Sequence, residues 1–177
     1  MRVVAGELKG RRLASPAKNA DVRPTADRVR EAIFSILGDV SGARVLDLYA
    51  GTGALAIEAL SRGAEQATLV DRRPDLARRN IADLGLSASA EVVGADAVRF
   101  LQRDSNTYDL IFCDPPYRLA DRLEGQLESL IPARLAAGGR LIAESDAHGP
   151  LRLRLPAVVE RTYGDTAIAV YANPADA

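Results

Sequence analysis

The chain has 177 residues, a formal net charge of −1 and a single cysteine. This length suits one domain with one hydrophobic core, and a lone cysteine excludes an internal disulfide and a multi-cysteine zinc site. No apolar run approaches the roughly 18 residues of a membrane-spanning helix and the N-terminus is polar and basic, so we expect a cytoplasmic protein without a membrane segment.

The first element along the chain is a basic arm. Residues 1–30 carry eight Arg or Lys against three acids, whereas residues 31–177 carry fifteen against twenty-one. We expect residues 1–24 to form this arm. It is either a solvated terminus or a segment that contacts phosphates.

After the arm, the spacing of apolar residues predicts a helix over 25–37, with Thr25 as its N-cap and Gly38 at its end. Short apolar runs then alternate with helical segments, which implies right-handed crossovers and a mostly parallel sheet. The last two strands are separated only by Gly164-Asp165, a turn that joins antiparallel strands. We therefore predict a seven-stranded, mostly parallel α/β sheet with a C-terminal antiparallel hairpin, followed by a tail at 174–177. The predicted strands are 44–48, 67–70, 91–93, 110–113, 141–143, 158–163 and 167–171, and the predicted helices between them are 53–61, 75–84, 97–103 and 121–136.

Residues 45–55 combine the end of a strand, a glycine turn and the start of a helix. Gly51 and Gly53 let the backbone bend sharply and approach a ligand closely, and the N–H groups at the helix start point into the same space. Asp47 precedes the glycines, where its carboxylate can accept from an ammonium group but would repel a pyrophosphate. This pattern predicts a cofactor loop.

Two further acids end the next strands. Asp71, twenty residues after Gly51, is placed to accept both hydroxyls of a ribose, and Asp96 can accept from an adenine amine. With Asp47 they suit a ligand that has a ribose, an adenine and a cationic amino-acid tail, namely S-adenosylmethionine. The alternative is that each acid only caps the following helix. The predicted cofactor residues are Thr25, Asp47, Gly51, Thr52, Gly53, Asp71, Arg72, Asp96 and Ala97.

The apolar run that ends at residue 113 is followed by Asp114-Pro115-Pro116-Tyr117. Neither proline donates a ladder hydrogen bond and both fix φ, so the strand must stop and present its carboxyl end, where open α/β sheets bind ligands. A carboxylate, a free carbonyl on a stiff backbone and an aromatic face together fit a planar base with an exocyclic amine. We predict that Asp114, Pro115, Pro116 and Tyr117 form the catalytic site, with Tyr117 stacked on the base.

Cys113 lies within the apolar run before Asp114, and the only histidine, His148, lies far along the chain in a segment next to Gly149 and Pro150. We interpret Cys113 as a buried strand residue rather than a catalytic thiol, and His148 as a solvated loop residue. No His, Cys and carboxylate residues have the spacing of metal ligands, so we expect no metal cofactor.

Four stretches resemble the ribosomal RNA small-subunit methyltransferase D family: residues 2–11, residues 23–31 (RPTADRVRE), residues 55–64, and Asp114 to Tyr117. The resemblance implies a Rossmann-like class I methyltransferase domain at 25–173. It implies transfer of a methyl group from S-adenosylmethionine to the exocyclic N2 of one guanine in 16S ribosomal RNA. It further implies that Asp71 binds the ribose and Asp96 the adenine, while the segment from Asp114 to Tyr117 holds the target base.

The target nucleotide must be unpaired or extruded to reach such a site. Because the chain has no separate RNA-binding domain, we expect the arm and the loops around Asp114 to make most RNA contacts. An assembly intermediate of the small ribosomal subunit is then a better substrate than free RNA, and we expect the protein to act on it as a monomer. The predicted RNA contacts are Arg2, Lys9, Arg11, Arg12 and Arg118.

Two other functions stay open from the residues alone. A DNA adenine-N6 methyltransferase would use the same base-binding motif, although the chain lacks extra domains for reading a DNA site. A nicotinamide-dependent oxidoreductase is supported by the glycine turn and Asp71, but Asp47 and the Asp114 motif argue against it.

Overall fold

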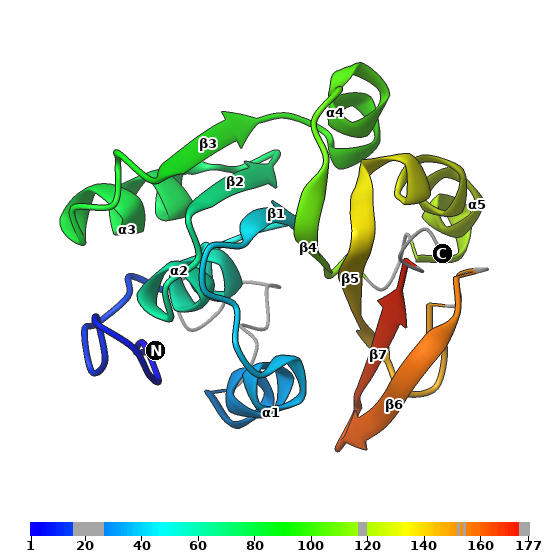
Figure 1. The fold of residues 1–177 in the computed structure, drawn as a ribbon, viewed down its shortest axis with the longest axis horizontal. Helices are drawn as coiled ribbons and strands as arrows, with labels where there is room; N and C mark the ends of the chain where they lie inside the picture. The colour runs from blue at the N-terminus through cyan, green and yellow to red at the C-terminus, as the bar shows by residue number, and fades with distance from the viewer. Residues whose placement is uncertain (16–26, 117–119, 152, 154, 174–177) are drawn as a thin grey trace.

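The computed structural model describes residues 1–15, 27–116, 120–151, 153 and 155–173, and its helices and strands alternate along the chain (Figure 1). The helices are α1 (Asp27–Leu37), α2 (Ala54–Ser61), α3 (Asp75–Asp83), α4 (Ala97–Arg103), α5 (Ala120–Leu130) and the 3-10 helix η2 (Pro132–Arg134). The strands are β1 (Arg44–Leu48), β2 (Gln66–Asp71), β3 (Ala90–Gly94), β4 (Tyr108–Cys113), β5 (Leu135–Asp146), β6 (Ala157–Tyr163) and β7 (Thr166–Ala172).

The strands form one sheet of seven, in the order β3-β2-β1-β4-β5-β7-β6. The first five strands in this order are parallel to one another, and β7 runs antiparallel to both β5 and β6. The predicted mostly parallel sheet with a C-terminal antiparallel hairpin is therefore confirmed. The strand order reverses between β1 and β4, and open α/β sheets bind ligands at the carboxyl ends of the strands on either side of such a point.

Successive side chains of a strand point to opposite faces of the sheet, so the core is divided into two layers, one on each face. Phe112 faces α1, where its ring centroid lies 5.8 Å from that of Phe34, and it shares this layer with residues of α2 and α3. Ile111 points to the opposite face and packs with Leu101 of α4 and Leu127 of α5. Both faces of the central strands are thus covered by helices, so ligands can reach the sheet only at its ends (Figure 1).

The predicted helix over 121–136 is wrong at its C-terminal end, because α5 stops at Leu130 and β5 already begins at Leu135. Pro132 explains the early end, since it has no N–H to continue the helical ladder and instead opens the 3-10 turn. The predicted strand at 141–143 is correspondingly too short. The first part of β5 is irregular: a Cβ on Gly139 would lie 2.8 Å from the carbonyl oxygen of Ala136, and the pairing with β4 shifts register there.

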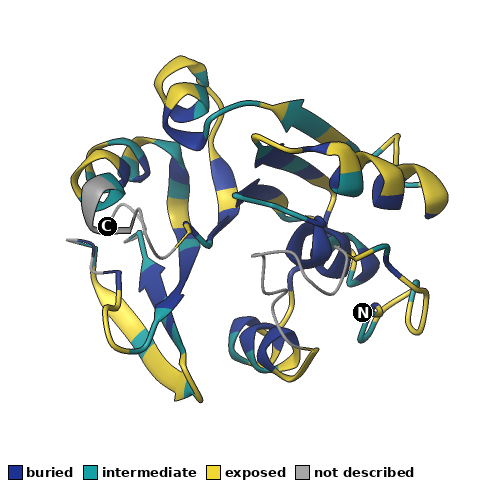
Figure 2. Cartoon of the chain, turned by 180° about the vertical axis from the view of Figure 1, so that it is seen from behind, coloured by how far each residue is buried: buried dark blue, intermediate teal, exposed yellow. Residues whose placement is uncertain are grey.

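The outer edge of the sheet is β6, which is exposed along most of its length (Figure 2). None of the helices in the described ranges is long and apolar enough to cross a membrane.

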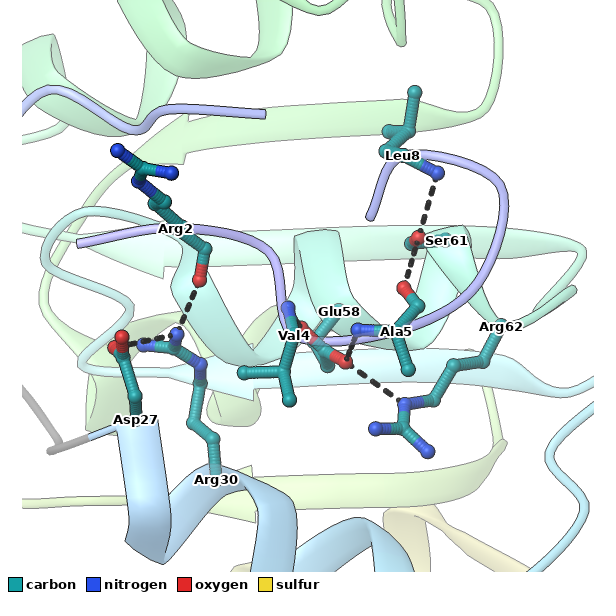
Figure 3. A network of polar contacts seen from close by, with 9 residues as sticks. All are labelled: Arg2, Val4, Ala5, Leu8, Asp27, Arg30, Glu58, Ser61 and Arg62. Atoms are coloured by element: carbon teal, nitrogen blue, oxygen red, sulfur yellow. Dashed lines mark hydrogen bonds and ion pairs between the residues drawn. The ribbon is translucent and has the colours of Figure 1, made fainter. Parts of the chain in front are cut away.

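Residues 1–15 of the basic arm are docked onto α2 (Figure 3). The buried carboxylate of Glu58 accepts the N–H groups of Val4 at 2.7 Å and Ala5 at 2.9 Å, and the Ser61 hydroxyl donates to the carbonyl of Ala5 at 2.6 Å. A Cβ on Gly6 would lie 1.8 Å from the carbonyl oxygen of Ser61, so only glycine permits this close approach. Residues 1–15 are therefore a docked segment rather than a solvated terminus.

Candidate active site

The glycine loop between β1 and α2 lies beside the reversal point of the sheet. Gly51 and Gly53 have φ values of +55° and +77°, which side chains rarely adopt. A Cβ on Gly53 would also lie 2.7 Å from Cδ2 of Leu69, so the loop packs tightly onto β2. Thr52, between the two glycines, is buried, and its carbonyl accepts a hydrogen bond from Nδ2 of Asn80 at 2.9 Å.

Asp71, the last residue of β2, holds this loop in place. Its Oδ2 accepts the N–H of Gly51 at 2.7 Å, and its Oδ1 accepts the N–H of Arg73 at the same distance. Each carboxylate oxygen has a second lone pair, so Asp71 can still accept from the two hydroxyls of a ribose. The structure thus brings Asp71 and the glycine loop together, as the sequence predicted.

Asp96 caps α4, because its Oδ1 accepts the N–H of Arg99 at 3.0 Å. Its Oδ2 pairs with the guanidinium of Arg72, whose Nε lies 3.0 Å away. Burial acts to raise the pKa of Asp96, but these two partners outweigh it and hold the pKa below its ordinary value. Asp96 thus caps α4, and its ion pair with Arg72 links two predicted cofactor residues.

An open cleft of about 770 Å³ adjoins this ion pair. Its walls come from the ends of β2 and β3, from α4 and from α5, and they are largely polar. Ala97, the first residue of α4, is buried in the core and does not line this cleft. The lining residues are Arg72, Gly94, Ala95, Asp96, Val98, Arg99, Gln102, Leu123 and Gln126.

Tyr49, which follows β1, has a strained backbone with φ of +62°, the only positive φ outside glycine among the described residues. Its buried hydroxyl has no hydrogen-bond partner in the described part of the chain. Burial raises the pKa of this hydroxyl, so it stays protonated as a donor. Strain and an unsatisfied donor at one residue are typical of ligand-binding sites. Together with the glycine loop and Asp71, this donor fits a nucleoside-containing cofactor.

Three acids on the adjacent strands β1, β4 and β5 influence one another electrostatically: Asp47 on β1, Asp114 directly after β4 and Glu144 on β5. Asp47 is 3% exposed, and its Oδ2 accepts the N–H of Ala56 at 3.2 Å. Burial, with smaller contributions from Asp71 and Glu144, raises the pKa of Asp47 to about 7. Burial and the charges of Glu144 and Asp47 raise the pKa of Asp114 well above its ordinary range. Such a group of acids attracts a cation, because a nearby positive charge favours the ionised form of each acid.

Asp114 follows the last residue of β4 directly, so its carboxylate stands at the carboxyl end of that strand. Pro115 is buried and Pro116 is exposed. Cys113 is 1% exposed and burial raises the pKa of its thiol, so the interpretation as a buried strand residue is confirmed. His148 is exposed and contacts Asp146 through Nδ1 at 3.0 Å, as expected of a loop residue.

Three predicted site residues, Thr25, Tyr117 and Arg118, lie outside the described residues. The predicted RNA contacts Arg2, Lys9, Arg11 and Arg12 all lie on the docked N-terminal segment, away from the acids, and are exposed. Arg11 reaches α3, where its Nη2 donates to the carbonyl of Asp83 at 3.4 Å. No cluster of three or more His, Cys, Asp or Glu residues with metal-binding geometry occurs within the described ranges.

Sequence reasoning missed Tyr49, Glu58, Asn80 and Glu144. Glu144 had a usable signal, because it follows a short apolar run, residues 141–143, as Asp114 follows residues 110–113. Glu58 stands within the stretch 55–64 that carries the family resemblance, but nothing local indicated that it binds the N-terminus. Tyr49 and Asn80 had no signal, since backbone strain and long-range hydrogen bonds leave no pattern in the sequence.

Comparison with known proteins gives consistent results. The sequence model of the family described as Conserved hypothetical protein 95 matches residues 1–172. A relative from Bacillus subtilis named "Putative rRNA methyltransferase YlbH" is 37% identical, over 97% of this chain and 98% of the relative. Ribosomal RNA small subunit methyltransferase D of Escherichia coli K12 is 39% identical over 67% of this chain, an alignment that spans 61% of that protein.

Solved structures agree with the fold. "Putative methyltransferase yhhF from Escherichia coli" covers 99% of both chains with a TM-score of 0.83 and 32% identity. An RNA methyltransferase of Salinibacter ruber, solved with S-adenosyl-L-homocysteine, has a TM-score of 0.65 at 19% identity and covers 88% of this chain and 96% of its own, which shows the shared Rossmann-like fold alone. The chain therefore belongs to the ribosomal RNA small subunit methyltransferase D family, whose sequence model is described as Conserved hypothetical protein 95.

Proposed function

We propose that this protein transfers a methyl group from S-adenosylmethionine to the exocyclic N2 of a guanine in 16S ribosomal RNA. We further propose that it acts as a cytoplasmic monomer on an assembling small ribosomal subunit. The observation that carries the proposal is the position of Asp114 and Pro115 at the carboxyl end of β4, next to the glycine loop across the reversal point of the sheet. The relatives named as ribosomal RNA methyltransferases support the same reaction class.

The cofactor would lie across the ends of β1, β2 and β3. Asp71 would accept from its ribose, Asp96 and the adjoining cleft would bind its adenine, and Asp47 would bind its ammonium group. The hydroxyl of Tyr49, which has no partner in the described part of the chain, would donate a hydrogen bond to the same ligand. When bound, S-adenosylmethionine supplies an electrophilic methyl group on a positively charged sulfur.

Asp114 and the carbonyl of Pro115 would accept hydrogen bonds from the two N–H groups of the target amine. With both N–H groups held, the nitrogen can pyramidalise and direct its lone pair at the methyl group, and alignment is the main contribution that the protein must make. As the N–C bond forms, the C–S bond would break with its electrons left on sulfur, and the methylated amine would then lose one proton to water. Asp114 must be ionised for this role. The acidic neighbours that raise its pKa also attract the cationic cofactor, whose charge would lower that pKa again. Tyr117 is predicted to stack on the base.

The docked N-terminal segment would provide the phosphate contacts. Its four exposed cations are Arg2, Lys9, Arg11 and Arg12. Because Glu58 and Ser61 fix the backbone of this segment, its charges are presented from an ordered surface, and less entropy is lost on binding. Arg118 is predicted to reach a further phosphate beside the base.

The test is a map of modified nucleotides in 16S ribosomal RNA by mass spectrometry, in a strain that lacks this protein. We expect one N2-methylguanine to disappear and to return when the gene is restored. Purified protein should then label small-subunit particles, rather than naked 16S RNA or duplex DNA, from methyl-labelled S-adenosylmethionine. Label on adenine in DNA would instead establish the adenine-N6 alternative. The nicotinamide alternative has no support left, because the family is one of methyltransferases.

A further inference from the structure

Two arginines stand directly opposite each other in the docked N-terminal segment. Arg2 and Arg12 form an antiparallel bridge, and the N–H groups of Val3 and Leu13, the next residue on each strand, donate across it at 3.0 and 3.2 Å. This pattern is that of a non-hydrogen-bonded pair, in which the two Cα atoms are only about 4.5 Å apart. The side chains of Arg2 and Arg12 therefore leave the backbone close together and on the same face.

Both side chains face solvent. The residues that follow them, Val3 and Leu13, are 3% and 6% exposed and pack in the core. Because successive side chains of an extended chain point to opposite sides, Arg2 and Arg12 point outward, and both are exposed. Figure 3 shows the guanidinium of Arg2 directed away from Arg30, which binds the carbonyl of the same residue.

The charge of this pair is not compensated. Within the described ranges, neither Arg2 nor Arg12 has an acidic partner. The charge of the neighbouring Arg30 is matched by Asp27 at 2.9 Å. Like charges directly opposite each other on neighbouring strands repel and destabilise the pair. An anion between the two guanidinium groups would replace this repulsion with attraction.

The backbone around the pair is anchored on both strands. The carbonyl of Arg2 accepts from Nη2 of Arg30, a fully buried side chain, at 2.5 Å. On the other strand, Ala14, two residues after Arg12, exchanges two hydrogen bonds with Asn80 at 2.7 and 3.1 Å. The spacing of the two arginines is thus set before a ligand arrives, which lowers the entropy lost on binding.

A phosphodiester group fits this pair by its charge and its shape. It carries one negative charge on two terminal oxygens, and each guanidinium offers a planar fork of N–H donors that matches phosphate geometry. Two forks that start from neighbouring points can each bind one oxygen of the same group. Arg11 is placed differently, because its Nη2 reaches the carbonyl of Asp83 on α3 at 3.4 Å.

We propose that Arg2 and Arg12 together hold one phosphate of the 16S ribosomal RNA backbone. This inference rests on the proposed function, and it adds that two of the exposed cations on the segment form a single site. Phosphate contacts fix the orientation of a nucleic acid on a protein without reading its sequence. The N-terminal segment would in this way hold the RNA at a fixed point relative to the base-binding segment after β4.

The experiment measures the binding of small-subunit particles to Arg2→Ala, Arg12→Ala and the double variant over a range of salt concentrations, with S-adenosyl-L-homocysteine present. Each phosphate that a protein neutralises contributes about 0.7 to 0.9 units to the slope of the log binding constant against log salt concentration. The double variant should lose about one such contribution. Each single variant should weaken binding by about 10-fold, and the double variant by far less than the product of the two, because the loss of either arginine already releases most of the shared contact.

Arg161→Ala is the matched control, because it removes the same charge from the exposed strand β6, and it should keep the parent's affinity and salt slope. The Arg2 and Arg12 variants should melt no lower than the parent. Each substitution relieves the repulsion in the free protein and leaves the backbone anchors in place.

A loss of about two phosphate contributions in the double variant, with single effects that multiply, would overturn the shared site. A parent-like slope in the double variant, or an equal loss in Arg161→Ala, would overturn it too. A lower melting temperature in the variants would have the same consequence, because the arginines would then support the fold of the segment. Failure of the proposed function is distinguishable, since the parent would then leave guanine N2 of the particles unmethylated, whereas failure of the shared site changes only the variants.

Discussion

Asn80 on α3 and Ala14 on the docked N-terminal segment exchange two hydrogen bonds. The N–H of Ala14 donates to Oδ1 of Asn80 at 2.7 Å, and Nδ2 of Asn80 donates to the carbonyl of Ala14 at 3.1 Å. The same Nδ2 donates to the carbonyl of Thr52 in the glycine loop at 2.9 Å. A single side chain, 1% exposed, therefore connects the segment proposed to bind RNA with the loop proposed to bind the cofactor.

Asn80→Ala should lower the free energy of unfolding by about 2–4 kcal/mol, because it leaves buried polar groups of Ala14 and Thr52 unpaired. Denaturant unfolding measures this change. Hydrogen exchange should accelerate at Ala14 and at Gly53, the residues on either side of the lost contact. Asn106→Ala is the control, since Asn106 is exposed and its hydrogen bonds to Asp104 are local. Equal stability of the two variants would contradict the prediction.

Asp114→Ala should abolish methyl transfer and leave the affinity for S-adenosylmethionine nearly unchanged. The reason is that Asp114 is proposed to hold the target amine, on the far side of the transferred methyl group from the adenosine. Labelled methyl incorporation and calorimetry measure the two quantities separately. Parent-like turnover in this variant, on any substrate that the parent methylates, would disprove the role of Asp114.

Asp71→Ala should weaken cofactor binding by about 1–3 kcal/mol, as expected for the loss of charged hydrogen bonds. The structure adds a second cause, because the substitution also releases the N–H of Gly51 from its partner. Calorimetry with S-adenosyl-L-homocysteine measures the effect. Asp75→Ala is a useful comparison, since Asp75 lies nearby at the start of α3 and is exposed. A parent-like dissociation constant for the Asp71 variant would show that the carboxylate only orders the loop.

Asp47→Asn should stabilise the cofactor-free protein at pH 8 more than at pH 5. Burial raises the pKa of Asp47 from 3.8 to about 7, so the unfolded chain releases this proton near pH 4 whereas the folded chain keeps it to about pH 7. The group therefore lowers the unfolding free energy progressively across that window, by at most about 4 kcal/mol. An asparagine cannot ionise and avoids this cost. Denaturant unfolding at both pH values checks the difference, which should be absent if Asp47 titrates normally. The same variant should bind S-adenosylmethionine more weakly.

Replacing both Arg11 and Arg12 with Ala should weaken the binding of small-subunit particles. The slope of the log binding constant against log salt concentration should become shallower by at most about two units. Cofactor affinity should not change, because neither side chain contacts the glycine loop or the strand-end acids among the described residues. Arg161→Ala, on the exposed edge strand β6, serves as the control. If the double variant binds with the parent's affinity and salt slope, the RNA contacts lie elsewhere, with the loop at Arg118 as the next candidate.

The sequence determined the order of the elements, the cofactor loop and the strand-end acids. These depend on local physics: apolar periodicity sets each strand, Gly51 and Gly53 set the turn, and the prolines after Asp114 end the strand. Sequence patterns predicted the ends of helices and strands less well than their order. The helix α5 ends earlier than predicted, because Pro132 interrupts a helix that the composition would otherwise extend. The capping and cofactor interpretations of Asp96 could not be separated, since one carboxylate can serve both.

Only the tertiary structure decided which distant residues meet. The register of β4 against β5 places Glu144 beside Asp114, and the crossover from β2 to α3 brings Asn80 to both Ala14 and Thr52. The strained backbone of Tyr49 and the docking of residues 1–15 on Glu58 were likewise decided by the tertiary structure. Such contacts depend on strand pairing and packing across the whole chain, so residues that are adjacent in the site carry no common pattern in the sequence.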